Sequence, residues 1–169
     1  MKRLVVIFAL VCSILPVAIP RVRVDFDHAN DFSRYRTYRW AGPPNADFLN
    51  QLMQKRVIGF VEEALAAKGL KRVDTGGDLV INFQMNVTEQ PVYTTFGSGG
   101  WDWGWGGGIS TTTTQVFLTG ILTVDLVDSQ KGRLVFQGMS SAPVSSKPTH
   151  NTRRLARSVN EIFEKYPPR

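Results

Sequence analysis

The residues best suited to contact another molecule lie in one stretch, Phe96 to Ser110, which reads FGSGGWDWGWGGGIS. Trp101, Trp103 and Trp105 alternate through it, and Asp102 stands between the first two. Indole rings can stack on sugars, lie at a lipid headgroup boundary or fill a pocket on a partner protein. The surrounding glycines carry no side chain that could pack a core. The stretch is therefore predicted to be an adaptable contact surface.

Few other residues have types and spacing that suit catalysis. A hydrolase triad needs a histidine, and the chain has only His28 and His150, each among polar neighbours typical of a turn or a helix cap. Zinc needs three or four clustered ligands, and these histidines are far apart in sequence. The glycines match neither GxxxxGK(S/T) nor GxGxxG, so they predict no phosphate loop. The sequence predicts no catalytic residue, no metal and no cofactor.

The first twenty residues are typical of an export signal. Lys2 and Arg3 precede an apolar run without charge, Leu4 to Ile19, which is the order found in secretory signal peptides. The run is shorter than the roughly 20 residues of a spanning helix, but an uncleaved N-terminal anchor remains an alternative. Cys12 is the only cysteine and could carry a lipid, although Val11 before it departs from the usual lipoprotein pattern. We expect residues 1–20 to be a signal or anchor and residues 21–169 to be a single domain.

The charge of the chain does not indicate a nucleic-acid partner. The formal net charge is +6 and the pI is about 9.8, which alone could suggest one. However, acids and bases are interspersed along the chain, and no nucleic-acid-binding motif is visible. The arginine clusters at residues 34–39 and 153–157 are interpreted as solvated basic faces.

Hydrophobic periodicity predicts the elements that must position the contact stretch. Alternating apolar and polar residues predict strands at 22–26, 37–40, 79–87, 115–127 and 133–140. Three- and four-residue spacing predicts an amphipathic helix from Asp47 to about Lys68, and a second helix from about residue 148 to the Pro167-Pro168 pair. The order of these elements predicts an α+β two-layer domain, a mostly antiparallel sheet with both helices packed on one face.

The contact stretch should connect two of these strands. Residues 96–114, which include the threonine run 111–114, are predicted to form a Gly/Trp-rich loop at one end of the sheet, and Pro91 should end the preceding strand or mark an edge. The predicted core side chains are Leu49, Leu52, Met53, Phe60, Val61, Ala64 and Leu65 in the first helix, Leu79, Ile81, Phe83, Met85, Val87, Val116, Leu118, Leu122, Val124 and Leu126 in the strands, and Leu155, Val159, Ile162 and Phe163 in the second helix.

Several segments occur in a characteristic order along residues 22–168. They are VRVDFD, DFSRYRTYRW, AAKGLKRV, DLVINF, the Gly/Trp/Thr-rich insert, GILTVDLVD, KGRLVFQG and a final KYPP. This ordered set resembles the bacterial envelope protein family catalogued as domain of unknown function 4136. The resemblance implies a secreted or lipid-anchored protein of Gram-negative bacteria, without an established activity and without catalytic residues to carry over.

We therefore expect an exported, non-catalytic envelope binding or scaffold domain. It should reside in the periplasm, with Cys12 or an uncleaved N-terminal segment as alternative attachments to the membrane. Trp101, Asp102, Trp103 and Trp105 are the predicted contacts to an envelope protein, a glycan or a lipid surface. Two alternatives remain open: the tryptophans could fold back onto the sheet, or Asp102 could serve an enzyme that acts on envelope carbohydrate or peptide.

Overall fold

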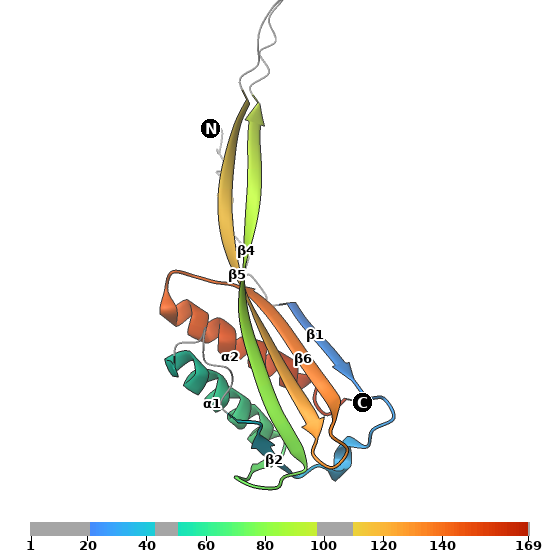
Figure 1. Ribbon diagram of the computed structural model, residues 1–169. Helices are drawn as coiled ribbons and strands as arrows, with labels where there is room; N and C mark the ends of the chain where they lie inside the picture. The colour runs from blue at the N-terminus through green and yellow to red at the C-terminus, as the bar shows by residue number, and fades with distance from the viewer. Residues whose placement is uncertain (1–20, 43–50, 98–109, 169) are drawn as a thin grey trace, which may run out of the picture.

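The protein is an α+β domain in two layers, a six-stranded sheet with two helices on one face (Figure 1). The computed structural model describes residues 21–42, 51–97 and 110–168. The elements are β1 (Arg21–Phe26), a 3-10 turn (Phe32–Arg34), β2 (Thr37–Trp40), α1 (Gln51–Ala67), β3 (Lys71–Arg72), β4 (Leu79–Gly97), β5 (Ser110–Asp128), β6 (Arg133–Pro143) and α2 (Pro148–Glu164). The predicted fold class is confirmed.

The sheet is mostly antiparallel, as predicted. Its strand order is β1-β6-β5-β4-β2-β3. The pairs β1–β6, β6–β5 and β5–β4 are antiparallel. β2 runs parallel to both β4 and β3, and the two-residue β3 was not predicted. The expected β5–β6 hairpin is present, and Gly132 supplies its left-handed residue at φ +61°.

The helices bury the faces that their spacing predicts. In α2, Leu155, Val159, Ile162 and Phe163 are all buried. The helix crosses β6 so closely that a Cβ added to Gly138 would lie 2.2 Å from a methyl carbon of Ile162. None of the helices in the described ranges is long and apolar enough to span a membrane.

The first helix corrects one predicted core residue. α1 buries Val57, Val61 and Leu65 at four-residue intervals, whereas Leu52 is 60% exposed. At 3.6 residues per turn, Leu52 stands about 140° around the helix from Val57, so it points away from the core. The predicted start at Asp47 and the core position Leu49 lie outside the described residues.

The strands on either side of the Gly/Trp stretch are longer than predicted. β4 continues through Pro91 to Gly97, and β5 begins at Ser110, so the predicted loop at residues 96–114 is wrong at both ends. Threonine is β-branched and favours extended backbone. The run at 111–114 pairs with residues 93–96, and the Thr95 and Thr112 hydroxyls are 3.2 Å apart. Pro91 lies at an edge of the sheet, which was one of its two expected positions.

Candidate functional site: the β4–β5 arm

β4 and β5 extend beyond the sheet as a two-stranded arm, defined as residues 89–97 and 110–118 (Figure 1). Pairing is continuous from Glu89 opposite Leu118 to Gly97 opposite Ser110. At about 3.4 Å per residue, the arm is roughly 30 Å long. The pairing of β6 with β5 ends at residue 119, and that of β2 with β4 ends at residue 81. Among the described residues, no third strand pairs with the arm.

The arm carries large apolar side chains that face solvent. Tyr93 is 68% exposed, Phe96 72%, Val116 57% and Phe117 51%. They occupy both faces, because opposite residues of an antiparallel pair share a face and successive residues alternate. A two-stranded ribbon is marginally stable by itself in water, and exposed apolar patches commonly mark interaction sites. The arm therefore has the features of a contact surface.

Three predicted core positions in β4 and β5 are corrected as well. Val87, Val116 and Leu118 continue the apolar alternation of the buried Leu122 and Val124, yet all three are exposed. Val116 and Leu118 belong to the arm, which projects past the helical layer (Figure 1), and Val87 lies just before the arm in β4. The alternation predicts which face a residue occupies, but not whether another layer covers that face.

The residues predicted to make contact lie at the end of this arm in sequence. Trp101, Asp102, Trp103 and Trp105 belong to residues 98–109, outside the described ranges, and Cys12 also lies outside them. The chain leaves the arm at Gly97 and re-enters it at Ser110, which are paired. The segment is therefore joined to the far end of the arm.

The fourth tryptophan has a different environment. Trp40 lies in β2 and is partly buried, and its indole N–H donates to Glu62 Oε1 at 3.0 Å. Its ring meets Phe83 edge-on, with 5.9 Å between the ring centroids. Trp40 is thus part of the domain body and is separate from the arm.

A shallow apolar groove of about 270 Å³ lies where the arm leaves the body. Small residues open it, because Gly120 pairs with Ala142 and Leu122 with Ser140 on the face that the helices cover. Its apolar lining includes Met53, Met85, Val87, Val144 and Leu155. This groove was not predicted from the sequence. The cross-strand pairing of small residues that signals it becomes visible only once the register is known.

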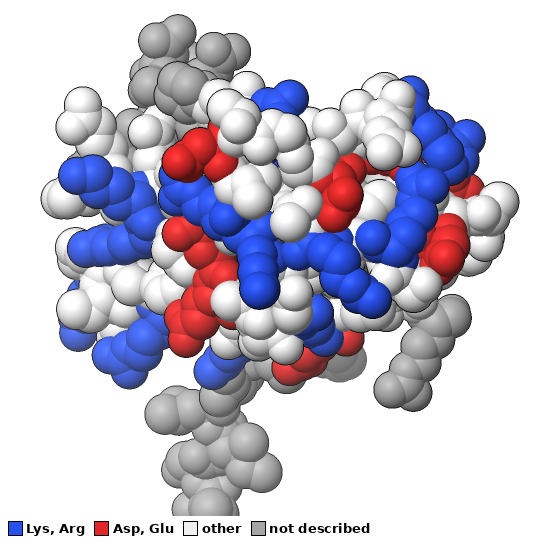
Figure 2. Space-filling view, turned by 90° about the horizontal axis from the view of Figure 1, so that it is seen from below, with Lys and Arg blue, Asp and Glu red and all other residues white. Residues whose placement is uncertain are grey.

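Charge is distributed unevenly between the two ends of the molecule. No lysine or arginine occurs between Arg72 and Lys131, and Glu89 is the only charged residue of the described arm. At the opposite end, lysine and arginine side chains gather with acidic side chains among them (Figure 2). Contact through the arm must therefore rely on apolar burial, stacking and neutral hydrogen bonds.

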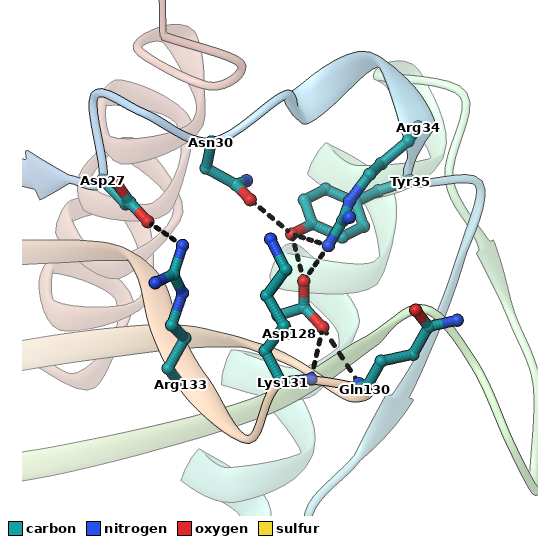
Figure 3. Close-up of polar contacts among 8 residues, drawn as sticks. All are labelled: Asp27, Asn30, Arg34, Tyr35, Asp128, Gln130, Lys131 and Arg133. Carbon is teal, nitrogen blue, oxygen red and sulfur yellow. Dashed lines mark hydrogen bonds and ion pairs between the residues drawn. The ribbon is translucent and has the colours of Figure 1, made fainter.

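A buried carboxylate, Asp128, is the second feature that could do chemistry (Figure 3). Its Oδ1 accepts from the Gln130 and Lys131 amides, both at 2.9 Å. Its Oδ2 accepts from the Tyr35 hydroxyl at 2.9 Å and from the Arg34 guanidinium. Burial alone would raise the pKa of Asp128, but these hydrogen bonds and the Arg34 charge outweigh it and lower the pKa.

The Asp128 cluster is built to hold loops together. It ties the β5–β6 turn to the segment before β2, and the neighbouring Asp78 accepts from the Arg36 and Thr37 amides, each at 2.8 Å. These amide bonds lower the pKa of Asp78. Both oxygens of Asp128 are already occupied by donors of the protein. Within the described ranges, no group of three or more His, Cys, Asp or Glu side chains could hold a metal ion.

The two histidines lie apart from this cluster. His28 packs against the ring of Phe26, with 4.2 Å between the ring centroids. His150 lies in the first turn of α2, and its amide donates to the Lys147 carbonyl at 3.0 Å. These positions agree with the turn and helix-cap contexts expected from the sequence.

Comparison with known proteins gives one family match. The family described as "Domain of unknown function (DUF4136)" matches residues 22–168, nearly all of the domain. No curated protein matches the chain.

Solved structures share the fold at low sequence identity. A PDZ domain protein from Parabacteroides distasonis has a TM-score of 0.61 at 12% identity, covering 89% of this chain but only 37% of that protein. The PelC dodecamer from Paraburkholderia phytofirmans has a TM-score of 0.51 at 11% identity, covering 86% and 96%. A DUF4136 family protein from Bacteroides thetaiotaomicron has a TM-score of 0.49 at 17% identity, covering 88% and 96%. At these identities, the first two likenesses show the fold alone.

Proposed function

This chain belongs to the DUF4136 family, and we propose that it is an exported, non-catalytic binding or scaffold domain of the bacterial envelope. Residues 1–20 direct its export to the periplasm, with lipidation of Cys12 or retention of the N-terminal segment as alternative attachments to the membrane. The contact surface is the arm together with residues 98–109. In this proposal, Trp101, Trp103 and Trp105 anchor an envelope protein, a glycan or a lipid surface.

One observation carries this proposal, the exposed apolar surface of the arm. A ribbon that projects about 30 Å from its domain body costs conformational entropy to order and buries little surface in return. Phe96, at 72% exposed, and Tyr93, at 68%, lie next to the end that bears the Gly/Trp segment. The three tryptophans would extend the same apolar surface outward. A partner that covers this surface would supply the burial that the free chain lacks.

The side chains of the arm limit the classes of ligand that it can bind. Without lysine or arginine between Arg72 and Lys131, the arm has no cation to pair with a phosphate or sulfate group. Aromatic rings and threonine hydroxyls instead suit neutral sugar faces, uncharged lipid headgroups or apolar pockets. The PelC structure, which has this fold, is described as a dodecamer, and this supports a role of the fold in protein assemblies.

Co-sedimentation with isolated envelope fractions tests the proposal. The unmodified protein should pellet with at least one of three fractions: membranes, peptidoglycan or outer-membrane glycolipid. The triple variant Trp101→Ala, Trp103→Ala, Trp105→Ala should bind at least about tenfold more weakly, because each buried aromatic anchor contributes on the order of 1 kcal/mol or more.

Two controls make the co-sedimentation specific. Trp40→Phe changes the tryptophan of the domain body and should leave binding unchanged. Asp102→Asn should also bind normally, and the unmodified protein should release no fragments from cell-wall material. Equal binding by the triple variant would contradict the proposed contact surface, and release of fragments that Asp102→Asn abolishes would contradict the non-catalytic role.

A further inference from the structure

The two edges of the arm differ in how they are protected against pairing with another strand. Natural proteins block exposed strand edges with charged residues, prolines or bulges, because an open edge is a template for strand addition. The β4 edge carries Glu89 and Pro91. The β5 edge, residues 110–117 with the sequence STTTTQVF, carries neither a charge nor a proline. One edge is blocked, and the other is open.

Two hydrogen bonds identify the residues that face outward along these edges. The Ala41 amide donates to the Ile81 carbonyl at 2.9 Å, and the Val144 amide donates to the Leu118 carbonyl at 2.7 Å. Both bonds leave the β4–β5 ladder on its outer sides. Because outward and inward residues alternate in an antiparallel pair, and no register shift interrupts β4 and β5, odd-numbered residues of β4 and even-numbered residues of β5 face outward.

Because of this alternation, the two edges differ in the backbone hydrogen bonds that they can offer to another strand. On β4, Pro91 falls on an outward position and removes the N–H that the row would present there. On β5, Ser110, Thr112, Thr114 and Val116 each direct an N–H and a C=O outward, and no strand in the described part of the chain pairs with them. The β5 row ends at Leu118, whose carbonyl already accepts from Val144.

We propose that the β5 edge pairs with the β5 edge of a second copy of this chain, antiparallel and around a two-fold axis at Thr113. In this register, Thr112 lies opposite Thr114 of the second copy, and Ser110 lies opposite Val116. All four outward residues of each copy then bond across the interface, which allows up to eight inter-chain hydrogen bonds. The result is a four-stranded sheet formed by two arms.

Charge and symmetry favour a second copy as the occupant. The chain has a formal net charge of +6, so most approaches of two copies bring like charges together, whereas residues 110–117 are uncharged. An antiparallel edge is complementary to itself under a two-fold axis. The register also sets threonine opposite threonine at Thr112, Thr113 and Thr114, and such cross-strand pairs are favourable.

The pairing involves residues other than the Gly/Trp segment, so it goes beyond the proposed function and does not depend on it. Because β5 runs from the end of the arm toward the body, antiparallel pairing places the two domain bodies at opposite ends of the joined arms. It also places the exposed β-branched residues of β5 beside those of the second copy. The ends that bear residues 98–109 remain outside the paired region.

A matched pair of proline substitutions tests which edge is used. Thr95 and Thr112 are cross-strand partners, both face outward, and their hydroxyls are 3.2 Å apart. Thr95→Pro and Thr112→Pro therefore remove the same side-chain contact and one outward N–H each, but on different edges. Pro91 shows that the arm accommodates an outward proline. By sedimentation velocity of the native full chain, Thr112→Pro should weaken dimerisation at least about tenfold, while Thr95→Pro should dimerise like the unmodified protein.

Cysteine cross-linking tests the register independently. Thr113→Cys should form an inter-chain disulfide under mild oxidation, because the two-fold axis brings both copies of residue 113 together. Thr94→Cys, at the position opposite Thr113 within one arm, should remain uncross-linked, and the unmodified chain controls for Cys12. A monomeric unmodified protein at micromolar concentration, equal loss of dimer in both proline variants, or equal cross-linking by both cysteine variants would overturn the proposal.

Discussion

Replacing Asp128 with asparagine should destabilise the protein, because the site suits a charged acceptor and not an amide. One oxygen of the side chain accepts from the Gln130 and Lys131 amides, and the asparagine oxygen can take over that role. The amide nitrogen would then face two donors, the Tyr35 hydroxyl and the Arg34 guanidinium. The two hydrogen bonds that Tyr35 and Arg34 donate to a charged carboxylate would be replaced by contacts between donors.

The expected loss is about 2 kcal/mol. A hydrogen bond to a charged group contributes about 1.5–3 kcal/mol. Two effects keep the loss below the upper end: the Arg34 side chain is 37% exposed and can turn to water, and the Tyr35 hydroxyl can donate to Asn30 Oδ1, which lies 3.2 Å away. For a domain of this size, the loss corresponds to a Tm lower by roughly 4–8 °C.

Thermal unfolding followed by circular dichroism, at neutral and acidic pH, is the assay. Folding lowers the pKa of Asp128, so its carboxylate stabilises the protein above its unfolded value of about 3.9, and this contribution is lost as the pH falls through the folded pKa. The deficit of Asp128→Asn should therefore shrink below about pH 4.

The ion pair between Asp27 and Arg133 is the matched control for that assay. It is 2.8 Å long and joins two partly exposed side chains near the same hairpin (Figure 3). Asp27→Asn should cost no more than about 1 kcal/mol. An unchanged Tm for Asp128→Asn at neutral pH, or a deficit that persists undiminished in acid, would refute the structural role assigned to Asp128.

Further predictions concern the packing of the body. Gly138→Ala should cost about 2–3 kcal/mol in urea unfolding, because its Cβ would lie 2.2 Å from a methyl carbon of Ile162; unchanged stability would contradict the close crossing of α2 over β6. Gly59→Ala, where no atom lies within 4 Å of the added Cβ, should instead stabilise by up to about 1 kcal/mol. Burial, with the nearby Glu62, raises the pKa of Tyr38 to about 12, so stability should decline between about pH 10 and 12. Tyr38→Phe should reduce that decline. If the variant and the unmodified protein have the same alkaline stability profile, titration of Tyr38 is not the cause of the decline.

The parts of the fold that follow from local patterns could be predicted. Residues 22–26 alternate because β1 has one covered face, and Leu155, Val159, Ile162 and Phe163 share a helix face because α2 packs on the sheet. These patterns depend on side-chain periodicity alone, which the sequence displays directly. The order of the elements then limits the architecture to an α+β domain in two layers.

The arm could not be predicted in the same way. Val116 and Leu118 continue the alternation of Leu122 and Val124. Whether another layer packs over these side chains depends on where the helices end, which is a property of the tertiary structure. The site shows the same limit. Composition draws attention to the Gly/Trp segment, whereas the Asp128 cluster depends on Tyr35, which lies 93 positions away in sequence.

The central claim is that the Gly/Trp segment is an exposed contact surface, and tryptophan fluorescence tests this claim directly. In the Trp40→Phe variant, the only indoles left are Trp101, Trp103 and Trp105. In the free protein, the emission of this variant should be red-shifted and quenched by acrylamide. When the envelope fraction that binds the protein is added, the emission should shift to the blue and become protected from acrylamide. Blue-shifted, protected emission in the free protein would show that the tryptophans fold back onto the protein, and would contradict an exposed contact surface.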